Sequence, residues 1–203
     1  MSQLALPLEW PAAEGEGDFV VGEANAHVVR HLHHWSLWPV MATVLVGPRK
    51  SGRSLLGRIF VGQSGGMLID DGERQPEETL FHAWNRAQST RRPLLIIADD
   101  APGYWKPQLP DLRSRLKASP RLTIAEPDEQ LATELIEKLL GARGLAAPPE
   151  VLNYLRPRIE RSYVAVLRLI DAVDDLSLAR RQRLTVPLAR LALERIGVID
   201  DSP

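Results

Sequence analysis

A strand-like run followed at once by a glycine-bearing loop constrains this chain more than any other feature. Residues 42–46 are apolar or β-branched, which is typical of a buried strand. They lead into Gly-Pro-Arg-Lys-Ser-Gly-Arg-Ser at 47–54, a Gly-x4-Gly-Lys-Ser pattern with arginine in the lysine position. In such a loop, backbone N–H groups and the N-terminus of the next helix bind phosphate. The pattern predicts a phosphate-binding loop, with an ordinary glycine-rich turn as the alternative.

The residues of this loop have separate expected roles. We expect Gly47 and Gly52 to lie against the phosphates, and Ser54 to reach a Mg²⁺ ion bound with the nucleotide. Arg53 stands where a lysine fits between the β and γ phosphates. A guanidinium is a larger, planar fork that pairs with phosphate but cannot occupy the same volume. We therefore expect nucleotide binding to tolerate Arg53 better than fast hydrolysis does.

Two further apolar runs end in acidic residues. Residues 66–69 precede Asp70 and Asp71. This is typical of a Walker B strand, in which the first acid holds Mg²⁺ through water and the second orients the attacking water. A simple turn is the alternative. Residues 93–98 precede Asp99, which we count among the cofactor-binding candidates because parallel sheets bind ligands at the carboxyl ends of their strands.

The connections between these runs predict the fold class. Only residues 55–65 separate the first two strands, so one short helix fits between them. A helical pattern at 80–87 and a fourth strand at 122–125 complete an alternation of helices and strands. This alternation is typical of a parallel α/β sheet. We expect a nucleotide-binding α/β domain over residues 18–126.

The rest of the chain has helical periodicity. Apolar residues recur at spacings of three and four from residue 127 onward, and Pro, Ser or Thr precede several of these runs. The pattern predicts helices that begin near residues 127, 148, 164 and 185, and a short separate helix at 176–183. We expect a small all-helical lid domain over residues 127–203.

A short arm, residues 1–17, precedes the α/β domain. Its prolines favour extended backbone, and the Gly- and Glu-rich residues 12–17 are typical of a linker. Each leucine left in water forgoes roughly 1.5–3 kcal/mol of burial. The arm therefore either folds back onto the domain or docks into an apolar pocket of another protein. In the second case the docking residues are Gln3, Leu4, Leu6, Pro7 and Leu8.

The composition excludes several classes of protein. Among 203 residues, 25 Lys+Arg and 26 Asp+Glu give a formal net charge of −1, so bulk charge does not favour coating of DNA. The chain has no cysteine, which excludes disulfides and thiol nucleophiles. No apolar run reaches the ~18 residues that span a bilayer. Residues 1–18 carry no Lys or Arg, unlike a signal peptide. We expect a cytoplasmic protein with no membrane partner.

Three other clusters favour structural roles. His27, His31 and His34 share a helix face and could hold a metal, but no cysteine or evident acid completes the ligand set. The tryptophans at 35, 38, 84 and 105 favour packing over stacking on nucleic-acid bases. The arginines within 180–195 indicate a solvated helix face or a basic patch, with at most weak contact to DNA.

Taken in order, these segments resemble the Hda group, short AAA+ relatives of the replication initiator DnaA. The blocks that carry the resemblance are Gln-Leu-Ala-Leu-Pro-Leu at 3–8, Phe-Val-Val-Gly at 19–22 with Asn25, the loop at 47–54, Ile-Asp-Asp at 69–71, Leu-Pro-Asp-Leu-Arg-Ser-Arg-Leu at 109–116 and Leu-Thr-Val-Pro-Leu at 184–188. The resemblance implies a P-loop AAA+ core followed by a helical lid. The short gap between the Walker motifs implies a core that lacks one helix and one strand.

The same resemblance implies a negative regulator of the initiation of chromosome replication. In that group the N-terminal peptide holds the sliding clamp, and the protein, carrying ADP, stimulates DnaA to hydrolyse its ATP. Arg115 would be the arginine finger offered to DnaA. Val20, Val21 and Asn25 would lie near the adenine of ADP, or of ATP. The clamp and DnaA are the implied partners, with DNA contacted indirectly, and a homodimer stays open.

One departure from the family pattern weakens the expectation for ADP. Val164 aligns where a sensor arginine of the lid is expected, and the flanking Arg161 and Arg168 are out of register. Two alternatives therefore stay open. The chain could be an ATPase or nucleotide switch that acts on its own, or a degenerate DnaA-like protein that binds DnaA or DNA without nucleotide.

Overall fold

A parallel four-stranded sheet forms the centre of the first domain. The computed structural model describes residues 19–99 and 105–198, so the expectations for residues 1–17 lie outside the described part. The strands are β1 (Ala42–Val46), β2 (Met67–Ile69), β3 (Leu94–Ile97) and β4 (Arg121–Thr123), in the order β2-β3-β1-β4. Ala42 lies opposite Leu94, and Val44 lies opposite Arg121. Every residue of β1 and β3 is buried, as expected for strands covered on both faces.

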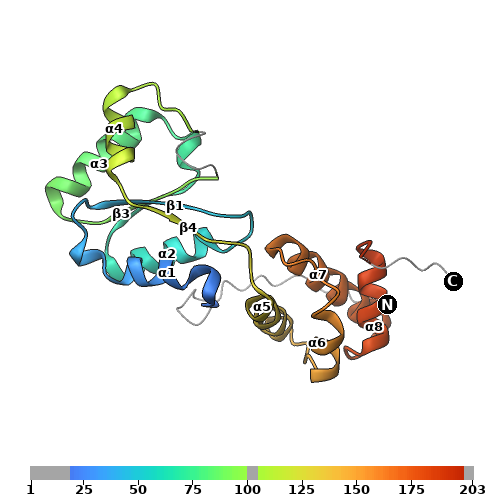
Figure 1. Ribbon diagram of the computed structural model, residues 1–203. Coiled ribbons are helices and arrows are strands. Elements are labelled where there is room, and N and C mark those ends of the chain that lie inside the picture. The colour runs from blue at the N-terminus through green and yellow to red at the C-terminus, as the bar shows by residue number, and fades with distance from the viewer. Residues whose placement is uncertain (1–18, 100–104, 199–203) are drawn as a thin grey trace, which may run out of the picture.

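Helices cover both faces of this sheet (Figure 1). On one face lie α1 (Glu23–His33) and α2 (Arg53–Ser64), and on the other lie α3 (Glu77–Thr90) and α4 (Pro110–Ala118). Short 3-10 helices occupy Trp35–Leu37 and Gly72–Arg74. Only α2 links β1 to β2, so the predicted shortening of the α/β core is confirmed.

A close approach of α2 to the sheet depends on one glycine. A Cβ atom on Gly57 would lie 2.8 Å from Leu68 Cδ1 and 3.0 Å from Ile97 Cδ1. Such distances are shorter than real side-chain contacts, so only glycine lets α2 pack this tightly on β2 and β3. This packing fixes how far the first residue of α2, Arg53, stands from the end of β3.

The second domain contains four helices in its described residues: α5 (Glu129–Ala142), α6 (Pro149–Leu155), α7 (Tyr163–Arg180) and α8 (Val186–Arg195). Side chains cap two of them, because Asp128 Oδ1 accepts from Leu131 N at 2.7 Å and Ser162 Oγ accepts from Ala165 N at 3.1 Å. Within the described ranges no helix is long and apolar enough to cross a bilayer.

The prediction of a separate helix at 176–183 is wrong. The helix α7 continues without a break through this region to Arg180. It ends where Arg181 takes a left-handed conformation, with φ +51, and where Gln182 N donates to the carbonyl of Ser177. No glycine or proline interrupts residues 163–180, so the backbone had no local reason to stop earlier.

The two domains have separate hydrophobic cores, and Tyr163 and Leu135 of the second domain pack against the first core. One core draws on residues 28–124 and the other on residues 132–193, on either side of the boundary predicted after residue 126. Tyr163, the first residue of α7, packs into the first core, and its hydroxyl donates to the carbonyl oxygen of Ala125 at 3.1 Å. The lid is therefore attached to the sheet by packing as well as by the chain.

Tyr163→Phe should lower stability by ~0.5–1.5 kcal/mol, because it removes one hydrogen bond between the domains. Burial raises the pKa of Tyr163 to about 12. A folded-state pKa above the unfolded value of ~10 stabilises the fold fully below that value, and the contribution is lost as pH rises toward the folded pKa. Urea unfolding of both proteins at about pH 8 and about pH 11 should show a difference that shrinks at the higher pH. A difference that stays constant would contradict this role of the hydroxyl.

Candidate functional site

The predicted phosphate loop connects β1 to α2. Residues 47–52 turn through positive φ at Lys50 (66) and Gly52 (82), and α2 begins at the next residue. The first N–H groups of a helix have no partner within it, and they attract anions. Gly47 lies beside Ile124, where a Cβ atom would meet backbone at 3.0 Å. The strand, loop and helix that the sequence predicts are therefore all present.

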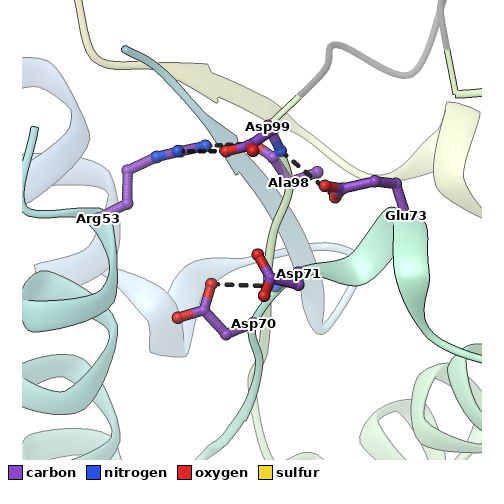
Figure 2. A network of polar contacts seen from close by, with 6 residues as sticks. All are labelled: Arg53, Asp70, Asp71, Glu73, Ala98 and Asp99. Atoms are coloured by element: carbon purple, nitrogen blue, oxygen red, sulfur yellow. Dashed lines mark hydrogen bonds and ion pairs between the residues drawn. The ribbon is translucent and has the colours of Figure 1, made fainter. Parts of the chain in front are cut away.

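Arg53 does not point freely into this loop. Its Nη1 donates to the carbonyl oxygen of Ala98 and its Nη2 to Oδ1 of Asp99, each at 2.5 Å. Figure 2 shows the guanidinium lying across from α2 to the end of β3. The Arg53 side chain is only 10% exposed, against 35% for Asp99. The hydrogen bond from Arg53 holds the pKa of the Asp99 carboxyl below its usual value, and the charges of Arg49 and Arg74 act in the same direction.

The two acids predicted as a Walker B pair lie just beyond β2. Asp70 Oδ1 accepts from the backbone N–H of Asp71 at 3.0 Å, and the Asp70 carbonyl accepts from Gln75. Asp71 is exposed, takes a left-handed conformation and precedes the 3-10 helix Gly72–Arg74. Figure 2 draws both carboxylates below the Arg53–Asp99 pair. Their roles toward Mg²⁺ and water, and that of Ser54 in the first turn of α2, stay predictions.

A cavity of about 160 Å³ lies between the α/β domain and the lid, beside the phosphate loop. Its walls are mostly apolar and come from both domains, and it reaches Lys50, Ser51 and Gly52. Ser51 is 4% exposed, and its Oγ has no hydrogen-bond partner among the described residues. A buried hydroxyl without a partner is costly. This cavity therefore suits a ligand with an apolar body and polar groups near the loop, as a nucleotide has.

The residues predicted near adenine differ in their placement. Val20 and Asn25 line this cavity, whereas Val21 lines a neighbouring groove between α1 and α2. The Asn25 side chain is already bonded to backbone, since Oδ1 accepts from Gly22 N and Nδ2 donates to the Val20 carbonyl, both at 2.9 Å. It therefore orients the segment that enters α1. Sequence reasoning assigned no role in this cavity to Phe19 or Tyr163, which both line it.

Arg115 lies in the last turn of α4, on the face of the sheet opposite α2 (Figure 1). Its guanidinium carbon is 4.0 Å from the centre of the Phe81 ring and 5.2 Å from that of Trp84. Its Nη1 is buried and has no hydrogen-bond partner in the described part of the chain. Ser119 Oγ accepts from Trp84 Nε1 and donates to the Arg115 carbonyl, which joins the ring to the end of α4. Arg115 is therefore placed away from the chain's own phosphate loop.

The arginines that flank Val164 do not replace a sensor arginine directly. Arg161 Nη2 lies 3.5 Å from a carboxylate oxygen of Glu129, which also pairs with Arg156 at 2.5 Å. Arg168 is exposed on α7. Arg161 is thus already paired with Glu129, the first residue of α5.

His31 and the four tryptophans lie in packed positions, whereas His27 and His34 are exposed. His31 Nε2 lies 3.0 Å from Thr43 Oγ1, and its ring stacks on Trp38 at 4.8 Å between centres. No group of three or more metal-ligating side chains occurs within residues 19–99 and 105–198. Trp38 is buried, and Trp35, Trp84 and Trp105 are half-buried against the core, which confirms the expectation that they pack.

Comparisons with known proteins agree with this architecture. Residues 128–193 match the family model described as the Hda lid domain. Domain III of DnaA from Thermotoga maritima superposes with a TM-score of 0.74 at 17% identity, over 88% of this chain and 95% of that one. AMPPCP-bound DnaA from Aquifex aeolicus gives 0.64 at 16%, over 81% and 65%. A variant of RuvB from Thermotoga maritima gives 0.69 at 14%, over 93% and 74%.

At these identities the solved structures establish the fold, and the family match concerns the second domain. Together they confirm the resemblance seen in the sequence. Residues 128–193 match the Hda lid domain, and the chain as a whole shares the fold of DnaA domain III, with a shortened α/β core.

Proposed function

We propose that this protein is a negative regulator of replication initiation that acts on the nucleotide of DnaA rather than on its own. The observation that carries the proposal is the engagement of Arg53 with Asp99 and Ala98. Hydrolysis in a P-loop site needs a cation on the β and γ phosphates. Here that cation is committed to a carboxylate of its own chain. The site therefore suits a nucleotide that is held, ADP with Mg²⁺, and not one that is turned over.

The placement of Arg115 supports action on a partner. It lies across the sheet from the loop at 47–52, so it cannot serve the chain's own phosphates. An arginine finger supplied to another protein's nucleotide can raise the rate of hydrolysis by about 10³–10⁵. A cation–π contact such as that with Phe81 contributes only about 0.5–2 kcal/mol. Releasing the guanidinium toward a phosphate therefore costs far less than the finger supplies.

The resemblance to the Hda group suggests the sliding clamp and clamp-loaded DNA as further partners. Gln3, Leu4, Leu6, Pro7 and Leu8 would hold the sliding clamp, which tethers the protein beside clamp-loaded DNA. Tethering raises the local concentration of the two proteins without any new contact between them. DNA itself would be contacted indirectly, in the cytoplasm, and a homodimer is compatible with the proposal.

Arg115→Ala should abolish stimulation of DnaA. Phosphate release from ATP-bound DnaA, with clamp-loaded DNA present, should fall by about 10³ or more relative to the wild-type regulator. Arg113→Ala is the matched control, because Arg113 is exposed on the same helix and its Nη2 bonds the Pro107 carbonyl at 2.8 Å.

Equal stimulation by the Arg115 variant and wild type, with unchanged thermal midpoints, would refute the finger. The same assay without DnaA should show no turnover by the wild-type protein. Steady ATP turnover by the protein alone would instead favour the independent ATPase.

Replacing Gln3 and Leu6 together by alanine should greatly weaken binding to the sliding clamp, because the pair removes one polar and one apolar anchor. Surface plasmon resonance with immobilised clamp measures this directly. A double variant in the adjacent linker, Glu14→Gln with Glu16→Gln, should bind like wild type. If both double variants and the wild type bind equally, the N-terminal segment is not the clamp-binding element.

A further inference from the structure

We propose that the turn between α7 and α8 binds the phosphodiester backbone of duplex DNA. The residues that make the contact are Arg180, Arg181 and Arg183, which we call the turn arginines. The inference does not rest on the proposed function, in which these residues have no part and DNA is contacted only indirectly.

The turn arginines lie far from the nucleotide site. Helix α7 begins at Tyr163, which packs against the first core, and runs for 18 residues to Arg180. At 1.5 Å per residue, the two ends of this helix are about 25 Å apart. Figure 1 shows α8, which follows the turn, on the side of the lid away from the sheet. A ligand on the turn arginines therefore leaves the cavity between the domains open.

No carboxylate from the neighbouring sequence neutralises the turn arginines. Residues 176–193 contain neither Asp nor Glu. The acids that flank this stretch are paired with other arginines: Asp174 with Arg143, Asp175 with Arg195 and Glu194 with Arg190. Within residues 19–99 and 105–198, none of the turn arginines has an ion pair or a side-chain hydrogen bond, and all three are exposed. Three positive charges within four residues are thus available to an anion.

The turn keeps an arginine at a position that favours glycine. Arg181 ends α7 with φ +51, a left-handed conformation that residues with a Cβ atom rarely adopt. Two hydrogen bonds hold this shape, since Gln182 N donates to the Ser177 carbonyl at 3.1 Å and Ser177 Oγ donates to the Gln182 carbonyl at 2.6 Å. Strained residues of this kind cluster at functional positions. A turn that is already ordered also presents its charges with little further loss of entropy on binding.

The composition of the turn favours a row of phosphates over other anionic partners. Duplex DNA carries one negative charge per ~1.7 Å of its axis, and a guanidinium pairs with phosphate oxygens through two parallel N–H groups. Gln182 and Thr185 are exposed in the same turn and can donate to the same backbone.

Other partners would need groups that the turn lacks. Single-stranded nucleic acid is bound by stacking on aromatic rings, and residues 176–193 include no aromatic residue. An acidic protein would need an apolar centre beside the charges, and Leu178 is the one large apolar side chain exposed between residues 176 and 193. The phosphodiester backbone of a duplex therefore fits the turn best.

The contact has a definite dependence on salt. The formal net charge of the chain is −1, so the rest of the molecule adds no bulk attraction to DNA. Each phosphate that an arginine neutralises releases counterions and contributes about −0.9 to the slope of log K against log salt concentration. Three such contacts give a slope of about −2.7. Binding should not depend on base sequence, because backbone contacts carry no sequence information directly.

Fluorescence anisotropy of a labelled duplex of mixed sequence, with the full-length protein and without clamp or DnaA, tests the inference. For wild type, the Kd should rise about 40-fold between about 50 mM and about 200 mM salt. Replacing all three turn arginines by glutamine should abolish most of the binding and of this dependence, whereas replacing them by lysine should keep both. The matched control replaces Arg30, Arg86 and Arg121, exposed residues of α1, α3 and β4, by glutamine and should bind like wild type.

Arg181→Gly separates binding from folding. Glycine takes the left-handed conformation without strain, so this variant should unfold at a higher temperature than wild type. It should nevertheless bind the duplex more weakly, with a salt slope closer to zero by about one.

Three results would overturn the inference: no duplex binding by wild type at about 50 mM salt, equal binding by wild type and the glutamine triple variant, or tighter binding to poly-glutamate than to the duplex. The third would assign the turn to an acidic protein. None of the three bears on the proposed function, which depends on Arg115 and on the release of phosphate by DnaA.

Discussion

The parallel pairing of β1 with β3 on one side and β4 on the other is the constraint on which the rest of the structure depends. Bonds from Ala98 N to Leu45 O and from Ile124 N to Val46 O continue the pairing past the strand ends. Because the strands are parallel, the loops that follow β1, β2 and β3 leave the same edge of the sheet. The phosphate loop, Asp99 and the acids after β2 are neighbours for this reason, although they are far apart in sequence.

In that arrangement, the arginine at residue 53 differs from the usual lysine in its bonding partners as well as in its shape. A long, planar guanidinium reaches a carbonyl and a carboxylate on the adjacent strand at once. The phosphate loop is kept, but its cation is neutralised within the chain. On the opposite face, Arg115 rests on aromatic rings, where a guanidinium is held weakly. In the proposed function, the fold thus separates the site that would hold ADP from the arginine that would act on DnaA.

The sequence predicted much of this fold because its strongest signals are local. The run at 42–46 with its loop and the acids after residues 69 and 98 each depend on a few adjacent residues. The helix expected at 176–183 was wrong because apolar spacing alone does not show where one helix ends and another begins.

The features that sequence reasoning missed are contacts between distant residues. Arg53 and Asp99 are 46 residues apart, and Trp84 and Ser119 are 35 apart, so no periodic pattern records either pair. Two sequence features together could have indicated the Arg53–Asp99 pair. They are the arginine in the lysine position and the acid at the end of a neighbouring strand. No sequence feature indicated that Phe19 and Tyr163 line the cavity between the domains, because apolar residues are ordinary in any core.

A crystal structure of the protein with ADP and Mg²⁺ tests the central claim most directly. We expect the phosphates to lie against the N–H groups at the start of α2 while Arg53 keeps its bonds to Asp99 and Ala98. A guanidinium turned onto the β phosphate, with the Asp99 carboxylate left unpaired, would contradict this claim.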